Sequence, residues 1–234
     1  MIDFWTVNRY GTAYKMPDYI RFVDKEVPSR YDSNGMVITT DITKEQLLGL
    51  AEEQLATQAH VKFTFPPDIT VPMLEDYELS ELEIYELTTP MFAVNEAITV
   101  QFVDAATVPD FLQLSYDEAL PFGEKYAKER EAWLCRKLQQ DFVAVIAYYQ
   151  NEAVGAVELI VQENTVELDQ FFVREAFQRQ GIGSTIQAFI EAHFLYHTIF
   201  LVADASDTPR EMYQRQGYDY CATFYELTKQ PPSL

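Results

Sequence analysis

The feature that most constrains this chain is a short glycine-containing junction between a strand-like run and a helix-like run. Residues 166–173 are rich in β-branched and aromatic side chains, which predicts a strand. Apolar residues at helical spacing follow the junction: Ile182, Ile186, Phe189, Ile190 and Phe194. The junction itself reads Gln178-Arg179-Gln180-Gly181-Ile182-Gly183. We therefore expect a strand, a loop and a helix in immediate succession.

A loop of this kind can bind phosphate groups. Glycines let backbone N–H groups converge without interference from Cβ atoms, and the start of a helix adds partial positive charge. A dinucleotide site would need a third glycine where this chain has Ile186, so the dinucleotide fingerprint is incomplete. A helix-entry turn without a ligand is the structural alternative, although two glycines are more than a helix cap requires.

The elements predicted after the junction extend the pattern. A second strand is expected over residues 198–203. A short helix should start at Thr208-Pro209 and end at Gly217, and a final strand is expected over residues 218–227. Gln178 to Gly183 match the element Q/R-x-x-G-x-G/A, and residues 212–218, Met-Tyr-Gln-Arg-Gln-Gly-Tyr, are similar to L-Y-x-x-x-G-F. In this order residues 98–227 resemble the GNAT superfamily of acyl-CoA-dependent N-acyltransferases.

The resemblance implies an α/β (α+β) fold with a mixed, mostly antiparallel sheet flanked by helices. We expect the GNAT-like acetyltransferase domain to span residues 96–234. Within it, residues 98–103, 142–149 and 153–161 read as strands, and a helical region is broken at Leu120-Pro121. Residues 1–95 are expected to form a smaller α/β domain, with a helix that starts at Thr43. Its order of elements is similar to a degenerate half-copy of the same fold.

The resemblance also assigns a binding site for acetyl-CoA. Backbone groups of the strand before the loop would pair with the pantetheine arm, and the loop would hold the pyrophosphate. Ser206 stands where the superfamily often has Asn, which leaves that contact open to Asp204 or Asp207. The residues expected to contact the cosubstrate are Phe171, Phe172, Val173, Gln178, Arg179, Gln180, Gly181, Ile182, Gly183, Ser184, Asp204 and Ser206.

Acyl transfer to an amine requires a proton acceptor and benefits from a donor to the departing thiolate. Glu167 and Asp169 are two apart on one strand and are expected to face the same side, and Glu158 is a third candidate base. The resemblance makes Tyr213 the group that assists the thiolate. The reaction expected is acetyl transfer from acetyl-CoA to a primary amine by direct attack in a ternary complex. A non-catalytic acyl-CoA sensor or interaction module is the alternative.

Composition limits the partners of the chain. Its 234 residues carry a formal net charge of -20, which argues against nucleic acid and is compatible with a cationic small-molecule or side-chain amine. We expect no membrane span, and the two cysteines suggest a cytoplasmic protein. His193 and His197 share helical spacing but lack the other ligands of a metal site, so no metal is expected. The acidic run over residues 75–83 reads as a solvated strand face.

Overall fold

The fold was analysed in a computed structural model that describes residues 11–28, 30, 33–140, 142–206 and 210–229. The chain divides into two compact units. The first contains Met1–Ile84, Ala203–Thr208 and Cys221–Leu234, and the second contains Tyr85–Val202 and Pro209–Tyr220. In each unit the strands pair in a mixed, mostly antiparallel pattern and are flanked by helices, which confirms the predicted fold class.

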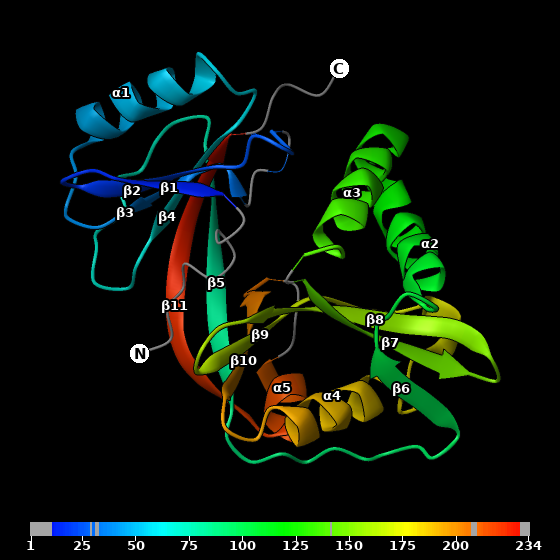
Figure 1. The fold of residues 1–234 in the computed structure, drawn as a ribbon. Helices are drawn as coiled ribbons and strands as arrows, with labels where there is room; N and C mark the ends of the chain where they lie inside the picture. The colour runs from blue at the N-terminus through cyan, green and yellow to red at the C-terminus, as the bar shows by residue number, and fades with distance from the viewer. Residues whose placement is uncertain (1–10, 29, 31–32, 141, 207–209, 230–234) are drawn as a thin grey trace. The chain divides into compact units, whose positions relative to one another are not determined.

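The first unit is built on the neighbouring strands β1 (Thr12–Lys15), β2 (Tyr19–Val23), β3 (Met36–Ile38), β4 (Val61–Phe65) and β11 (Tyr218–Lys229), whose last residues belong here. Helix α1 (Lys44–Leu55) covers this sheet (Figure 1). The predicted Thr43 cap is confirmed as a capping box: the Gln46 N–H donates to Thr43 Oγ1, and the Thr43 N–H donates to Gln46 Oε1.

Strand β11 joins the two ends of the chain. It pairs antiparallel with β4, with Leu227 opposite Phe63 and Tyr225 opposite Phe65. Phe63 and Leu227 are fully buried in one hydrophobic cluster with Met36 and Leu47. The first unit therefore takes in residues 221–234 as well as the N-terminal segment, and the boundary predicted between residues 95 and 96 remains a prediction.

Strand β5 (Glu78–Leu87) begins within the acidic run of residues 75–83. Glu83 is only 2% exposed, so the prediction that this run is a solvated strand face is wrong at Glu83. The side chains from Glu83 to Tyr85 are all buried. The alternation of exposed and buried side chains along β5 therefore breaks down over residues 83–85.

In the second unit the strands are ordered β10 (Thr198–Asp204), β9 (Thr165–Val173), β8 (Glu152–Val161), β7 (Val143–Tyr149) and β6 (Ile98–Phe102). The β7–β8 hairpin turns at Gln150 and Asn151, both with positive φ, as a tight turn that matches the strand twist requires. Strands β6 to β9 pair antiparallel, and β9 pairs parallel with β10.

Helices cover both faces of the strands β6 to β10 in the second unit. Figure 1 shows α2 (Val108–Ala119) and α3 (Glu124–Lys137) on one face and α4 (Ile182–His193) on the other. The predicted break at Leu120-Pro121 is a 3-10 turn, η3 (Leu120–Phe122), that separates α2 from α3. A second 3-10 turn, η4 (Glu175–Phe177), and helix α5 (Arg210–Gln216) complete the unit. The proposed start of α5 at Thr208-Pro209 lies outside the described residues.

No helix in the described part of the chain is long and apolar enough to span a membrane.

Candidate functional site

The glycine loop leads directly into the N-terminus of α4. Gly181 is the N-cap residue and has the left-handed φ of 84°, and the helix begins at Ile182. Intrahelical hydrogen bonding begins when the Thr185 N–H donates to the Gly181 carbonyl. The N–H groups of Ile182, Gly183 and Ser184 therefore precede any intrahelical acceptor and carry the partial positive charge of the helix. This end of α4 can receive an anion such as a phosphate group.

Glycine is found at positions 181 and 183 of the loop for different structural reasons. Gly181 needs its positive φ. Gly183 has no unusual φ, and a Cβ built there would meet only Phe171 Cζ, at 3.8 Å. Neither backbone conformation nor internal packing requires glycine at 183. With glycine there, no side chain at position 183 covers the first-turn N–H groups of α4.

Asn95 holds the loop from a distant part of the chain. Its Nδ2 donates to the Gln180 carbonyl at 2.9 Å. Its backbone N–H donates to Thr185 Oγ1, and that hydroxyl donates to the Gly181 carbonyl at 2.8 Å. Asn95 was not among the site residues expected from sequence, because it lies 85 residues before Gln180 in an irregular connection with no motif.

The side chains of two predicted loop residues hydrogen-bond to backbone carbonyls of the segment just before the loop. Gln178 Nε2 donates to the Val173 carbonyl at 3.1 Å, and Gln180 Nε2 donates to the Ala176 carbonyl at 3.3 Å. Arg179 has a positive φ of 60°. The glutamine side chains thus stabilise the conformation in which the backbone of the loop is presented.

Strand β9 parts from β10 before it reaches the loop. The parallel pairing runs from Thr165 and Thr198 to Leu168 and Leu201, whereas β9 continues to Val173. The pairing with β8 shifts register between Glu158, opposite Asp169, and Ala156, opposite Phe172. This irregularity surrounds Gln170, whose φ is 48° and whose N–H donates to Asp169 Oδ1.

The separation bears on the residues predicted to hold the pantetheine arm. Phe171, Phe172 and Val173 are half-buried and lie in the stretch of β9 beyond the pairing with β10. An extended strand that lacks a neighbour on one side presents backbone donors and acceptors to an extended ligand. This edge and the α4 N-terminus are separated only by η4 and the glycine loop.

The three candidate carboxylates have different surroundings. Glu167 is 2% exposed, opposite Ile160 on β8, and Asp169 is half-buried. Glu158 lies opposite Asp169 and forms a buried ion pair with Arg130 of α3. That pair would have to break before Glu158 could accept a proton.

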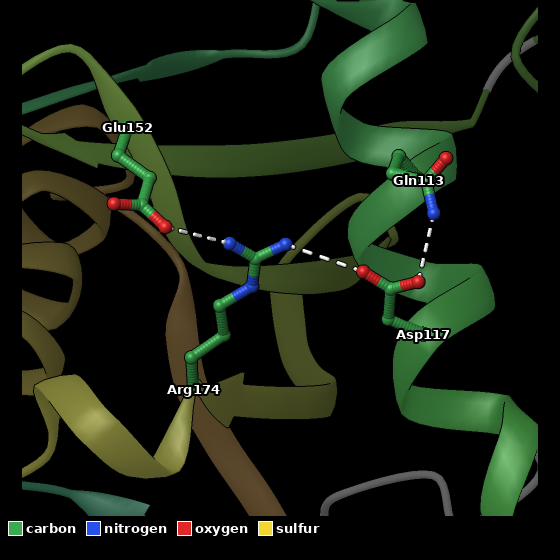
Figure 2. Close-up of polar contacts among 4 residues, drawn as sticks. All are labelled: Gln113, Asp117, Glu152 and Arg174. Atoms are coloured by element: carbon green, nitrogen blue, oxygen red, sulfur yellow. Dashed lines mark hydrogen bonds and ion pairs between the residues drawn. The ribbon is translucent and has the colours of Figure 1, made fainter.

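Arg174 follows β9 immediately and fastens two other elements to it. Figure 2 shows its guanidinium between Glu152 Oε1, at 3.0 Å, and Asp117 Oδ2, at 3.2 Å. Gln113 Nε2 donates to the other oxygen of Asp117 at 2.7 Å. Arg174 thereby ties α2 and the start of β8 to the end of β9. Sequence reasoning missed this arginine because its partners lie 22 and 57 residues away.

Tyr213 lies on α5 in a cluster of tyrosines. Its ring is 4.9 Å from that of Tyr85 and 6.1 Å from that of Tyr218, centroid to centroid. The hydroxyl of Tyr218 is buried without a hydrogen-bond partner among the described residues. Burial raises the pKa of Tyr218 above its usual value, and Tyr213 raises it further. Tyr213 itself is only half-buried.

The remaining predicted residues are Asp204 and Ser206, which belong to the first unit. Asp204 Oδ1 accepts hydrogen bonds from the N–H and the Oγ of Ser206, at 2.8 and 2.7 Å. His193 Nδ1 lies 2.7 Å from the Phe189 carbonyl. Within the described ranges, no three His, Cys, Asp or Glu side chains gather at a possible metal site.

Comparisons with known proteins agree with this geometry. Residues 112–226 match a family model described as an acetyltransferase (GNAT) domain. None of the curated proteins compared with the chain matches it.

Solved structures match over nearly the whole chain. A functionally unknown conserved protein from Staphylococcus epidermidis is 29% identical, with 98% of each chain covered and a TM-score of 0.84. A GCN5-related N-acetyltransferase from Kribbella flavida is 16% identical over 98% of this chain and 92% of its own, with a TM-score of 0.61. A GCN5-related N-acetyltransferase from Sphaerobacter thermophilus is 14% identical over 81% of this chain and 69% of its own, with a TM-score of 0.58. The family match identifies residues 112–226 as a GNAT acetyltransferase domain, and the solved GNAT structures share the fold of this chain.

Proposed function

We propose that this chain is an N-acetyltransferase that moves an acetyl group from acetyl-CoA to a primary amine by direct attack in a ternary complex. The observation that carries the proposal is the departure of β9 from β10 immediately before the open N-terminus of α4. The edge of β9 is suited to an extended amide-containing arm, and the N-terminus of α4 is suited to phosphate. CoA has an amide-containing arm and phosphate groups in the same order.

The loop would hold the pyrophosphate through the N–H groups of Ile182, Gly183 and Ser184, with the Arg179 guanidinium close by in sequence. The backbone of Phe171, Phe172 and Val173 would pair with the pantetheine amides. Gln178, Gln180 and Asn95 would support this site indirectly, since each hydrogen-bonds to the backbone around the loop.

In the chemical step a C–N bond forms between the amine and the acetyl carbon, and the C–S bond of the thioester breaks. An alkyl ammonium is almost wholly protonated at pH 7, so its proton must be lost before or during the attack. Glu167 or Asp169 would accept that proton, directly or through water. Tyr213 would donate a hydrogen bond to the departing thiolate. Full proton transfer from the phenol is uphill, because its usual pKa of about 10 exceeds that of a thiol, about 8.5.

The proposal extends to the rest of the chain. We assign one CoA site to each chain, because the glycine loop that leads into α4 lies in the second unit. Residues 46–51 also fit Q/R-x-x-G-x-G/A, but they lie inside helix α1. We assign the protein to the cytoplasm, in keeping with its free cysteines, Cys135 and Cys221. Residues 1–95 would form a smaller domain that accompanies the acetyltransferase domain of residues 96–234.

The test is release of the CoA thiol from acetyl-CoA in the presence of a panel of primary amines, with the corresponding alcohols as the control. Amine-dependent release is expected and hydroxyl-dependent release is not. Tight binding of acetyl-CoA without turnover of any amine would instead support the non-catalytic sensor.

A further inference from the structure

A cavity of about 160 Å³ lies in the second unit at the irregularity of β9. Its walls come from α2, η3, α3 and β9. A cavity of about this volume in another protein holds a benzene molecule, so the space suits an aromatic ring or a body of similar size. The residues that decide its chemistry are Ser115, Glu118, Phe122, Tyr126, Arg130 and Phe172.

Three of these side chains are aromatic. Phe122 and Tyr126 meet edge to face with ring centroids 6.2 Å apart, and Phe172 contributes from β9. Phe122 is 78% exposed, which is unusual for so large an apolar side chain. An exposed aromatic ring beside an aromatic-lined hollow is suited to an apolar ligand that would cover it.

Ser115 supplies a polar group that has no hydrogen-bond partner within the described ranges. It is only 2% exposed, and no described group hydrogen-bonds to its Oγ. A buried hydroxyl without a hydrogen bond is unfavourable, and a helical serine can usually donate to the carbonyl one turn earlier. Because Ser115 lines the cavity, its hydroxyl is available to a polar group of a ligand there.

The charges at the cavity favour a cation. The Arg130 guanidinium is committed to the buried ion pair with Glu158, whereas Glu118 is an exposed carboxylate. An anionic ligand would have to compete with Glu158 for Arg130 and would face Glu118. A cation would be attracted by Glu118 and by the faces of the aromatic rings.

We infer that this cavity binds the acceptor, and that the acceptor is a primary ammonium on an aromatic-sized apolar body. That the ligand is the acetyl acceptor rests on the proposed function. That the cavity binds an ammonium on an apolar body follows from the residues of the cavity alone. Small amines would leave the aromatic walls uncovered. Polyamines would bring extra positive charge against Arg130, and amino acids would bring a carboxylate against Glu118.

The experiment compares 2-phenylethylamine with methylamine, spermidine and phenylalanine in two assays. The first assay measures thiol release from acetyl-CoA. The second uses saturation-transfer NMR to measure binding of the amine to the protein in the presence of CoA. The kcat/KM for 2-phenylethylamine should exceed that for each of the other three by about 10-fold or more.

Matched variants locate the effect. Phe122→Ala should lower the preference for 2-phenylethylamine over methylamine by about 10-fold, whereas Tyr196→Ala, at a ring that is 94% exposed, should not change it. Glu118→Gln should weaken binding of 2-phenylethylamine by about 3- to 5-fold, and Glu163→Gln, which removes the same charge from an exposed turn, should not.

The two proposals fail differently. Amine binding that depends on Phe122 and Glu118, without any thiol release, would contradict the proposed function and support the cavity. Thiol release with no preference for 2-phenylethylamine, or with a preference that Phe122→Ala leaves intact, would overturn the cavity inference alone. Absence of both release and binding would overturn both.

Discussion

Asn95 donates a side-chain hydrogen bond to the carbonyl of Gln180, across 85 residues of sequence, and so fixes the loop that opens α4. The hydrogen bond from its own N–H to Thr185 Oγ1 secures the first turn of the helix as well. Asn95 therefore positions the backbone groups that we assign to the pyrophosphate.

Replacing Asn95 by alanine removes the clasp on Gln180 while leaving the backbone hydrogen bond. We expect acetyl-CoA to bind about 5- to 10-fold more weakly, because part of the binding free energy would be used to order the loop. The free energy of unfolding should fall by about 2 kcal/mol, as for two hydrogen bonds, because the Ala97 N–H also loses its bond to Asn95 Oδ1. Calorimetric titration and urea unfolding measure the two effects. Asn164→Ala, in the exposed turn before β9, is the control, and equal affinities in the two variants would contradict the role of Asn95.

Gly217, at the end of α5, should be among the least replaceable residues of the chain. Its φ is 92°, and a Cβ built there would lie 1.7 Å from the carbonyl oxygen of Thr89. Its own carbonyl accepts hydrogen bonds from the N–H groups of Thr88 and Thr89. We expect Gly217→Ala to destabilise the protein by about 3 kcal/mol or more.

Gly123→Ala separates backbone strain from the clash. Gly123 has a φ of 114°, but a Cβ built there meets nothing within 4 Å. Its replacement should cost only the conformational strain, about 1–3 kcal/mol. Urea midpoints compare the two variants. A smaller loss of stability at Gly217 than at Gly123 would show that the segment at Thr89 yields without cost.

Tyr213→Phe keeps the ring that packs on Tyr85 and removes the hydroxyl. If the hydroxyl assists departure of the thiolate, kcat should fall by ~10- to 10⁴-fold with little change in the KM for acetyl-CoA. Tyr220→Phe is the control, because Tyr220 also packs against Tyr85 but is 47% exposed. Steady-state kinetics with the best amine tests this, and a wild-type kcat in Tyr213→Phe would exclude the catalytic role.

From the burial of Tyr218 we expect the protein to lose stability at high pH. Its pKa is raised in the folded protein, first by burial and then by Tyr213, whereas an unfolded tyrosine ionises near pH 10. The stabilisation is complete below pH 10 and is lost as the pH rises above it, by at most about 1.4 kcal/mol per pH unit.

The difference between wild type and Tyr218→Phe isolates this contribution. Urea unfolding at pH 9 and pH 11 should show a smaller loss of stability in Tyr218→Phe than in wild type. At pH 7 the variant should be no less stable, because the hydroxyl removed is buried and lacks a partner among the described residues. Tyr196→Phe, at an exposed ring, should behave like wild type. An identical loss in all three proteins would contradict the assignment.

Features set by neighbours in the chain could be predicted from sequence. The Thr43–Gln46 capping box and the succession of strand, glycine loop and α4 each depend on a few adjacent residues. The family motif extended this local pattern to the whole acetyltransferase fold.

Features that depend on distant partners could not be predicted. Asn95 and Arg174 are polar residues in irregular segments, and only the folded chain brings Gln180, Asp117 and Glu152 to them. The sequence does not distinguish Glu158 from the other two strand carboxylates, because its ion pair with Arg130 of α3 forms only in the folded chain. Burial of Glu83 likewise follows from what covers β5, which alternation along one strand does not reveal.

The central claim is that the loop before α4 binds the pyrophosphate of acetyl-CoA, and Gly183→Val tests it most directly. A Cβ built at Gly183 meets only Phe171 Cζ within 4 Å, and the valine side chain is expected to cover the first-turn N–H groups. Gly49→Val is the matched control, because Gly49 is also helical and a Cβ built there meets nothing within 4 Å. Calorimetric titration with acetyl-CoA should show one site per chain in wild type and in Gly49→Val, and binding weakened by about 10-fold or more in a folded Gly183→Val. Equal affinity in Gly183→Val and Gly49→Val would contradict the claim.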